Sequence, residues 1–255
     1  MSERILLVDI GNTRIKWTTL RNARLGRQRA LAYDGWTAAD FGRRVFGPAA
    51  PVARIIVASV AGARVEAEIR AAVNARLHCP TEFVRSVRRR AGVVTRYGEP
   101  WRLGVDRFVA AIAAHQLAGD RAACVVSAGT AVTVDLIDRR GVHRGGVILP
   151  GPRLMVRSLL ESTSGIQRRA RGRAGRLELF ARSTRAAIEQ GAIYAVAAAA
   201  DRAVEEARRR LRTDPLVLLT GGAAPELRTL IRSPHTSVPD LVLRGVALYA
   251  GLSID

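Results

Sequence analysis

Two stretches of the chain share one pattern of hydrophobic and polar residues. In each, a run of apolar residues leads into a glycine turn, and a second run follows in which polar and apolar residues alternate, at residues 5–20 and 123–138. This layout predicts a β-hairpin. The turn is Gly-Asn-Thr in the first stretch and Gly-Thr in the second, so we predict an internal repeat.

Each predicted hairpin is followed by a further strand pattern and a helix pattern. In the first half, a β-rich run at 54–60 precedes helical spacing at 63–77. In the second half, a strand at 216–219 precedes the glycine pair 221–222 and a predicted helix at 225–232. Two related α/β halves are therefore expected.

Two longer helices are predicted outside this repeat. One spans 103–117, with Asp106 in its first turn and Gly119 just after its end. The other spans 185–212 and carries small residues along a ridge at 191–203. Such a ridge suits either close packing on the helix's own sheet or a subunit interface, and the sequence leaves both open.

Composition narrows the class of protein. The two cysteines, Cys79 and Cys124, have no CxxC spacing, which argues against a disulfide framework or a thiolate metal site and favours a reducing cytoplasm. The apolar run before Asp9 is shorter than the core of a secretion signal. The longest apolar run, at 192–200, is about half the length of a membrane span. We expect a cytoplasmic protein with no membrane partner.

The chain carries a net charge of +19, which would attract nucleic acids. Its basic residues are almost all arginines spread along the sequence, with short runs at 88–90 and 208–210. We interpret this as a composition bias on solvated faces, with no specific nucleic-acid partner. Lys16 is the only lysine, and its surroundings match neither a Walker A loop, a protein-kinase site nor a pyridoxal site.

The first glycine turn carries groups suited to nucleotide phosphates. Gly11 lets the backbone approach a ligand, and the side chains of Asn12 and Thr13 can hold phosphate oxygens together with backbone N–H groups. Asp9 would face a magnesium ion, because such an ion uses one or two carboxylates and several waters. An ordinary hairpin turn is the alternative, but the second turn at 129–131 favours the phosphate interpretation.

Several motifs occur in an order that resembles the type III pantothenate kinase family, a branch of the actin, sugar-kinase and heat-shock ATPase superfamily. Each motif is common by itself, but their order is specific. They are Asp-x-Gly-Asn-Thr at 9–13, Tyr97, Leu-Gly-Val-Asp-Arg at 103–107, Gly-Thr-Ala at 129–131, the segment 145–151, Ser-Thr at 183–184, and Thr-Gly-Gly at 220–222.

The resemblance implies a fold and a reaction. The fold is a duplicated actin-like, ribonuclease H-like α/β fold, with two similar domains at 1–118 and 119–255 and a cleft between them. The reaction is ATP-dependent phosphorylation of pantothenate to 4′-phosphopantothenate, the first step toward coenzyme A. ATP and Mg²⁺ are the implied cofactors, and a homodimer is the implied assembly.

The resemblance also assigns roles to residues. Asp106 is the implied catalytic base, which agrees with the ability of a carboxylate to accept a hydroxyl proton. The planar guanidinium of Arg107 suits binding of a carboxylate or a phosphate. The alternative is that Arg107 is a solvated residue on the helix surface. The implied nucleotide contacts are Asp9, Ile10, Gly11, Asn12, Thr13, Arg14, Ile15, Lys16 and Thr130. The implied pantothenate contacts are Tyr97, Gly104, Val105, Asp106, Arg107 and Thr184.

Ser127 departs from the family pattern. Many members carry an aspartate at this position, two residues before the second turn, where it holds a monovalent cation such as K⁺ or NH₄⁺. A serine hydroxyl can coordinate a cation but contributes no charge. A tight monovalent cation site is therefore not expected, whereas catalysis through Asp9, Asp106 and Thr130 is.

Two other functions stay open at the level of sequence. A non-catalytic regulatory homologue would suit the change at Ser127 and the positive charge, and a related small-molecule kinase would use another acceptor. The four histidines share no ligand spacing and no serine lies in a GxSxG elbow, which argues against a zinc site and a hydrolase triad.

Overall fold

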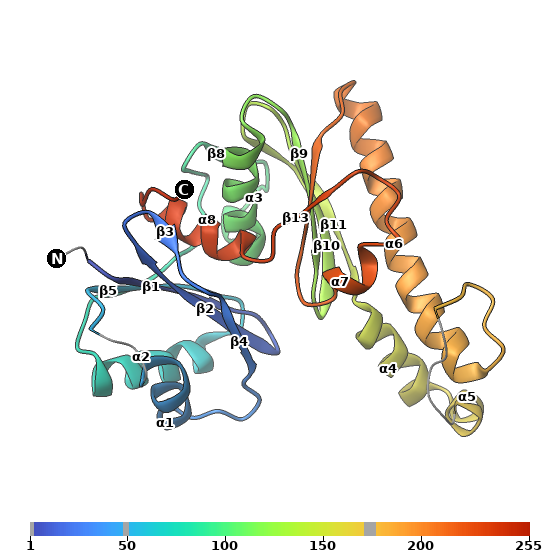
Figure 1. The fold of residues 1–255 in the computed structure, drawn as a ribbon, viewed down its shortest axis with the longest axis horizontal. Coiled ribbons are helices and arrows are strands. Elements are labelled where there is room, and N and C mark those ends of the chain that lie inside the picture. The colour runs from blue at the N-terminus through green and yellow to red at the C-terminus, as the bar shows by residue number, and fades with distance from the viewer. Residues whose placement is uncertain (1–2, 48–50, 171–176) are drawn as a thin grey trace. The chain divides into compact units, whose positions relative to one another are not determined.

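The computed structural model describes residues 3–47, 51–170 and 177–255, which group into two compact units (Figure 1). The first unit contains the chain up to residue 117 together with 140–143 and 240–255, and the second contains 118–139 and 144–239. The predicted domain at 119–255 included the two short segments that group with the first unit.

The first unit is built on a mixed sheet in the order β3-β2-β1-β5-β6, with β4 also paired to β2. Strands β1 and β2 form the predicted antiparallel hairpin, and β5 and β6 add in parallel beyond β1. The strand bounds are β1 Ile5–Ile10, β2 Arg14–Arg21, β3 Arg24–Leu25, β4 Arg29–Ala32, β5 Arg54–Ser59 and β6 Thr81–Phe83.

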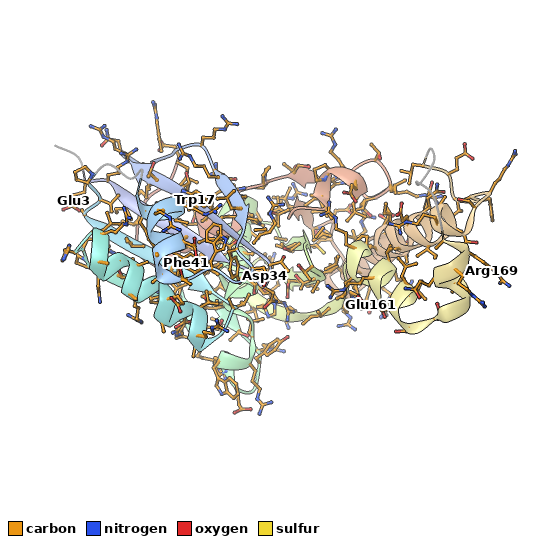
Figure 2. All side chains as sticks on the ribbon, turned by 90° about the horizontal axis from the view of Figure 1, so that it is seen from below. Glu3, Trp17, Asp34, Phe41, Glu161 and Arg169 are labelled. Carbon is orange, nitrogen blue, oxygen red and sulfur yellow. The ribbon has the colours of Figure 1, made fainter. Side chains whose placement is uncertain are left out.

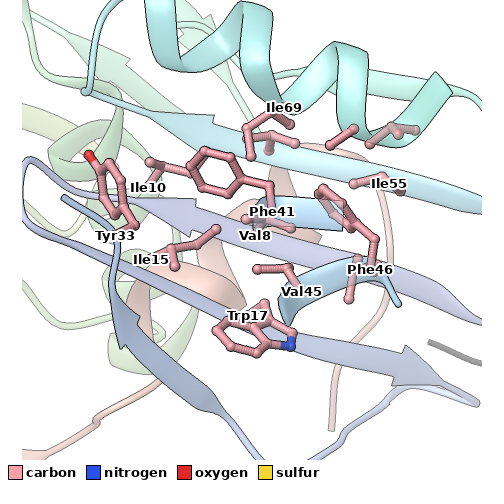
Figure 3. Close-up of a cluster of buried hydrophobic side chains, with 14 of the residues drawn as sticks. Val8, Ile10, Ile15, Trp17, Tyr33, Phe41, Val45, Phe46, Ile55 and Ile69 are labelled. Carbon is pink, nitrogen blue, oxygen red and sulfur yellow. The ribbon is translucent and has the colours of Figure 1, made fainter. Parts of the chain in front are cut away.

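The sheet of the first unit is covered on both faces, since all six residues of β1 are buried. On one face, Val8 and Trp17 pack with Phe41 and Ile69 (Figure 3). This cluster uses helix α1 (Ala38–Phe41), the π-helical turn Gly42–Phe46 and helix α2 (Ala63–Arg76). Because side chains alternate along a strand, Asp9 points to the opposite face.

The opposite face is covered by the chain's last helix, α8 (Leu241–Tyr249), which packs against β1 and β5 (Figure 1). Helix α3 (Val105–Ala118) packs closely against α8, where the ring centroids of Phe108 and Tyr249 are 6.4 Å apart. The first unit also contains β7 (Arg89–Arg90), β8 (Val93–Thr95) and a 3-10 turn at Pro100–Arg102.

The second unit repeats the strand arrangement of the first. Strands β9 (Ala123–Ala128) and β10 (Ala131–Ile137) form an antiparallel hairpin, and β12 (Leu216–Thr220) and β13 (Thr236–Ser237) add in parallel beyond β9. Strand β11 (Val142–Pro150) lies beyond β10. The predicted internal repeat is therefore confirmed.

Helix α6 (Thr184–Leu211) confirms the prediction of one long helix and packs on this sheet. Val196 and Val204 are fully buried against it, whereas Gly191 and Ala195 on the predicted small-residue ridge are exposed. Ala192 of the same ridge is buried and Ala203 packs against the core, so the ridge faces the sheet in part. Helices α4 (Pro152–Ser162) and α5 (Ser164–Arg169) precede it.

The helix predicted at 225–232 is shorter than expected. Helix α7 covers only Ala224–Leu227. The backbone N–H groups of Arg232 and Ser233 donate to the Asp201 carboxylate at 3.0 and 2.9 Å, and Pro234 follows. The carboxylate from α6 satisfies groups that a longer helix would have paired internally, and a residue before proline disfavours the helical conformation.

The two arginine runs differ in what they do. Arg209 and Arg210 pair with Glu206 at the surface, as the prediction of solvated faces requires. Arg88 and Arg90 are exposed too, but they donate to backbone carbonyls and so fix local structure, which the prediction did not include.

Figure 2 shows Trp17 and Phe41 inside the first unit, and Glu161 and Arg169 at the surface of the second.

None of the helices in the described part of the chain is both long and apolar enough to cross a membrane.

Candidate functional site

The first glycine turn joins β1 to β2 and is closed by a hydrogen bond from the Gly11 N–H to the Arg14 carbonyl at 3.0 Å. Asp9 and Lys16 are directly opposite each other in the hairpin. Their side chains therefore share a face, and Lys16 Nζ lies 3.7 Å from Asp9 Oδ2. Asp9 is 6% exposed, so a buried carboxylate and the chain's only lysine lie together beside the turn.

Burial raises the pKa of Asp9 from 3.8 to about 6. Lys16 acts in the opposite direction, and the charge of Asp106 raises the pKa further. Two carboxylates that are 97 positions apart in the sequence thus lie within electrostatic range of each other inside the first unit. A cation bound nearby would favour the charged form of Asp9 and lower its pKa.

Asp106 lies in the first turn of α3, where its Oδ1 accepts a hydrogen bond from the backbone N–H of Arg107 at 2.8 Å. Gly104 makes room for this carboxylate. A Cβ atom at position 104 would lie 2.7 Å from Asp106 Oδ1, closer than real Cβ contacts allow. A side chain at position 104 would displace the carboxylate, so the glycine in the Leu-Gly-Val-Asp-Arg motif permits its observed position.

Arg107 and Tyr97 form a second pair in the first unit. The Arg107 side chain is buried, and its Nη1 donates to the Tyr97 hydroxyl at 3.0 Å. The Tyr97 ring lies 5.9 Å from the fully buried ring of His143. The structure thus brings together Tyr97 and Arg107, both of which the resemblance assigns to pantothenate, and the burial of Arg107 excludes the alternative that it is a solvated surface residue.

Arg88 holds the loop that carries Tyr97, and sequence reasoning missed this role. Its guanidinium donates to the carbonyls of Thr95, Tyr97 and Gly98 at 2.7–2.9 Å. The fork geometry of arginine permits three such bonds from one side chain. No sequence signal distinguishes Arg88 from its neighbours in the run, because its acceptors are backbone atoms.

The second glycine turn joins β9 to β10 in the second unit. The Gly151 N–H donates to the Thr130 carbonyl at 2.8 Å, which fixes the turn from the start of α4. Gly221 approaches from β12 with a φ of +101°, and a Cβ there would lie 2.2 Å from the Ala128 carbonyl oxygen. This close approach explains why the Thr-Gly-Gly motif needs its first glycine.

Ser127 lies in a row of three hydroxyl residues on neighbouring strands. It pairs with Thr133 on β10 and with Thr220 on β12, and residues paired in this way share a face of the sheet. The hydroxyls of Thr133 and Thr220 are buried and have no hydrogen-bond partner among the residues that the structure describes. Sequence reasoning singled out Ser127 alone, because the register that aligns the three hydroxyls is tertiary information.

The other residues that were predicted to contact ATP or pantothenate differ in how exposed they are. Ile10, Ile15 and Val105 are buried. Asn12, Thr13 and Arg14 are exposed in the first turn. Thr184 is half-buried at the first position of α6 in the second unit, directly after the N-cap residue Ser183.

Comparison with known proteins agrees with this geometry. Residues 5–206 match the family model described as type III pantothenate kinase. The type III pantothenate kinase of Nitrosococcus oceani is 35% identical over 263 residues, covering 96% of this chain and 93% of the relative. That of Aromatoleum aromaticum is 38% identical over 249 residues, covering 96% and 97%.

The chain belongs to the type III pantothenate kinase family. Members of this family are ATP-dependent kinases, and the predicted reaction, the phosphorylation of pantothenate, is the reaction of the family. In fold, the kinase is similar to MreB 5 of Spiroplasma citri, at a TM-score of 0.52 and 10% identity, covering 98% and 96% of the two chains. This confirms the predicted duplicated actin-like α/β fold.

Proposed function

We propose that Asp106 is the base that takes the proton from the pantothenate hydroxyl as this oxygen attacks the γ-phosphate of ATP. The observation that carries this proposal is the pair of carboxylates Asp9 and Asp106, held within electrostatic range of each other in one unit of a kinase of this family. Phosphoryl transfer depends mainly on positioning and charge neutralisation, and a carboxylate supplies the one proton acceptor that it needs.

Arg107 is proposed to bind the carboxylate of pantothenate. Its guanidinium is buried and oriented by the hydrogen bond to Tyr97, whose loop is in turn held by Arg88. A guanidinium held in this way loses little conformational freedom when a ligand binds, and it can form two parallel hydrogen bonds to a carboxylate. This arrangement favours an acidic acceptor over a neutral one.

Nucleotide phosphates are proposed to bind at Asp9 to Lys16 and at Thr130. The donor set of the first turn fits Mg²⁺ with most of its waters retained, because it offers one buried carboxylate, and the described residues contain no cluster of three or more His, Cys, Asp or Glu that could replace those waters. When bound, Mg²⁺ would neutralise phosphate charge. Asp9 would orient the ion through water, while Lys16 holds Asp9 in place.

The reaction can be tested directly with a coupled assay for ADP release. We expect turnover that depends on both pantothenate and Mg²⁺, and mass spectrometry should find one added phosphate on pantothenate. ADP release that does not depend on pantothenate would favour a kinase with another acceptor. Nucleotide binding without turnover would favour a regulatory homologue.

The hydroxyl row predicts a weak response to monovalent cations. Serine and threonine hydroxyls can coordinate K⁺ or NH₄⁺, but Ser127, Thr133 and Thr220 supply no charge, and charged ligands dominate the affinity of oxygen sites for hard cations. The native kinase should therefore need a high K⁺ concentration or respond weakly. Ser127→Asp should shift half-activation to lower K⁺, as measured by titrating K⁺ in the kinase assay.

The same variant has a second expected effect. Without a cation, the new carboxylate would repel phosphates, so Ser127→Asp should be slower than the native enzyme in buffer free of Na⁺ and K⁺. Ser127→Thr, which keeps the hydroxyl, is the matched control. If the native enzyme saturates at low K⁺ and Ser127→Asp changes nothing, Ser127 does not lie at a cation site.

We propose that the kinase is a homodimer formed through α4 and α6. Val156 and Leu160 of α4 and Ile193 of α6 line a groove of about 580 Å³, and Leu159 beside it is 42% exposed. Sedimentation at micromolar concentration should show a dimer, and Leu159→Arg should weaken it. A native monomer would contradict the proposal.

We propose the location and partners that the sequence predicts. Both cysteines, Cys79 and Cys124, are free thiols, which supports a reducing cytoplasm as the proposed location. Several surface arginines are paired with carboxylates, as at Glu206, which supports the proposal that no specific nucleic acid is bound.

A further inference from the structure

Tyr33 reaches the first glycine turn from a distant part of the chain. It follows the end of β4, is 7% exposed, and its hydroxyl donates a hydrogen bond to the carbonyl oxygen of Gly11, 22 residues earlier. None of the motifs that point to the kinase family includes this residue.

The ring of Tyr33 is fixed by the hydrophobic core of the first unit. It lies 6.4 Å from the ring of Trp36 in an edge-on arrangement and 5.8 Å from the ring of Phe41. Figure 3 shows the ring beside Ile10 and Ile15 at one end of the cluster, with its hydroxyl at the edge. The core therefore determines where the hydroxyl points.

The hydrogen bond from Tyr33 fixes one peptide unit of the turn. The Gly11 N–H already donates to the Arg14 carbonyl, so with Tyr33 both backbone polar groups of Gly11 are held. In a trans peptide, the carbonyl and the following N–H point in opposite directions. Holding the Gly11 carbonyl toward Tyr33 therefore directs the N–H of exposed Asn12 away from the core.

We infer that Tyr33 is a positioning residue that orients the Asn12 N–H toward a nucleotide phosphate. This inference rests on the proposed role of the first turn in holding phosphates. Tyr33 does not touch the ligand. It contributes by fixing in advance a donor that a free turn would have to order on binding. Burial and the nearby charge of Asp9 raise the pKa of Tyr33, so its hydroxyl stays protonated and able to donate at neutral pH.

The test is Tyr33→Phe, which keeps the ring in its packing site and removes only the hydroxyl. We expect the Kd for ADP, measured by calorimetry, to rise about 3–10-fold, which corresponds to the net free energy that one hydrogen bond contributes. KM for ATP should rise by a similar factor, with kcat and KM for pantothenate changed less than twofold. Amide hydrogen exchange at Gly11, whose N–H is hydrogen-bonded to the Arg14 carbonyl, should become faster as the turn loosens.

Two controls separate positioning from packing. Trp36→Phe alters the packing around Tyr33 but leaves its hydroxyl, and Tyr194→Phe removes a hydroxyl from α6 in the second unit. Both should keep native ADP affinity. Native ADP affinity and native exchange in Tyr33→Phe would overturn the inference, as would an equal loss of affinity in Trp36→Phe.

The outcome is independent of the proposed reaction, because ADP binding is measured without pantothenate. If the native chain bound ADP but did not phosphorylate pantothenate, the proposed function would fail while the effect of Tyr33→Phe on ADP binding still decided the inference.

Discussion

Asp106→Asn is expected to lower kcat by ~10²–10⁴-fold, the range that removal of a general base gives. The asparagine side chain is the same size and its oxygen can still accept the hydrogen bond from the Arg107 N–H, so the start of α3 should keep its shape. The amide cannot accept the proton of the pantothenate hydroxyl. Steady-state kinetics should therefore show the loss in kcat, and calorimetry should show ADP affinity close to native.

Asp120→Asn is a matched control for this variant. Asp120 is exposed just after the end of α3, so its replacement should leave kcat within twofold of native. If Asp106→Asn turned over within a few-fold of the native enzyme, Asp106 would be removed from the role of base.

Asp9→Asn is expected to act through the metal. An outer-shell partner of a metal typically contributes 10–100-fold to affinity, so the Mg²⁺ concentration for half-maximal activity should rise by ~10–100-fold, and kcat should fall as well. The measurement is a Mg²⁺ titration of the ADP-release rate at saturating pantothenate. An unchanged titration would show that the first turn does not orient the metal.

The fold of Asp9→Asn can be checked through its stability. The folded pKa of Asp9, about 6, lies above its ordinary value of 3.8, so the folded state binds this proton more tightly. Protonated Asp9 therefore stabilises the folded state below about pH 4, and this stabilisation is lost as the pH rises through about 6. Asp9→Asn should flatten the dependence of Tm on pH in this window, and its Tm at pH 7.5 should not fall below native.

Much of the candidate site could be predicted because its residues are local in sequence. The Asp9–Lys16 pair follows from the hairpin register, since a short turn fixes which residues of β1 and β2 are opposite. Asp106 and Gly104 follow from one helix start. Local patterns also predicted the repeat, because the hairpin and the strand after it carry their own hydrophobic periodicity.

Contacts between distant segments required the tertiary structure. Tyr33 reaches Gly11 only because β4 pairs with β2, and Thr133 and Thr220 flank Ser127 only through strand pairing. Arg88 gave no signal because its partners are backbone carbonyls, which every sequence contains.

The sequence by itself determined the two hairpins, the long helices and the motifs that define the family, since periodicity and turn chemistry act over a few residues. The tertiary structure alone decided that α8, at the end of the chain, covers the face of the first sheet that carries Asp9. It also decided that the helix after β12 ends at Leu227, and that the backbone donors of Arg232 and Ser233 bind Asp201 instead of continuing it. Both outcomes depend on which distant surface buries apolar area or satisfies a polar group, and a linear pattern does not contain that information.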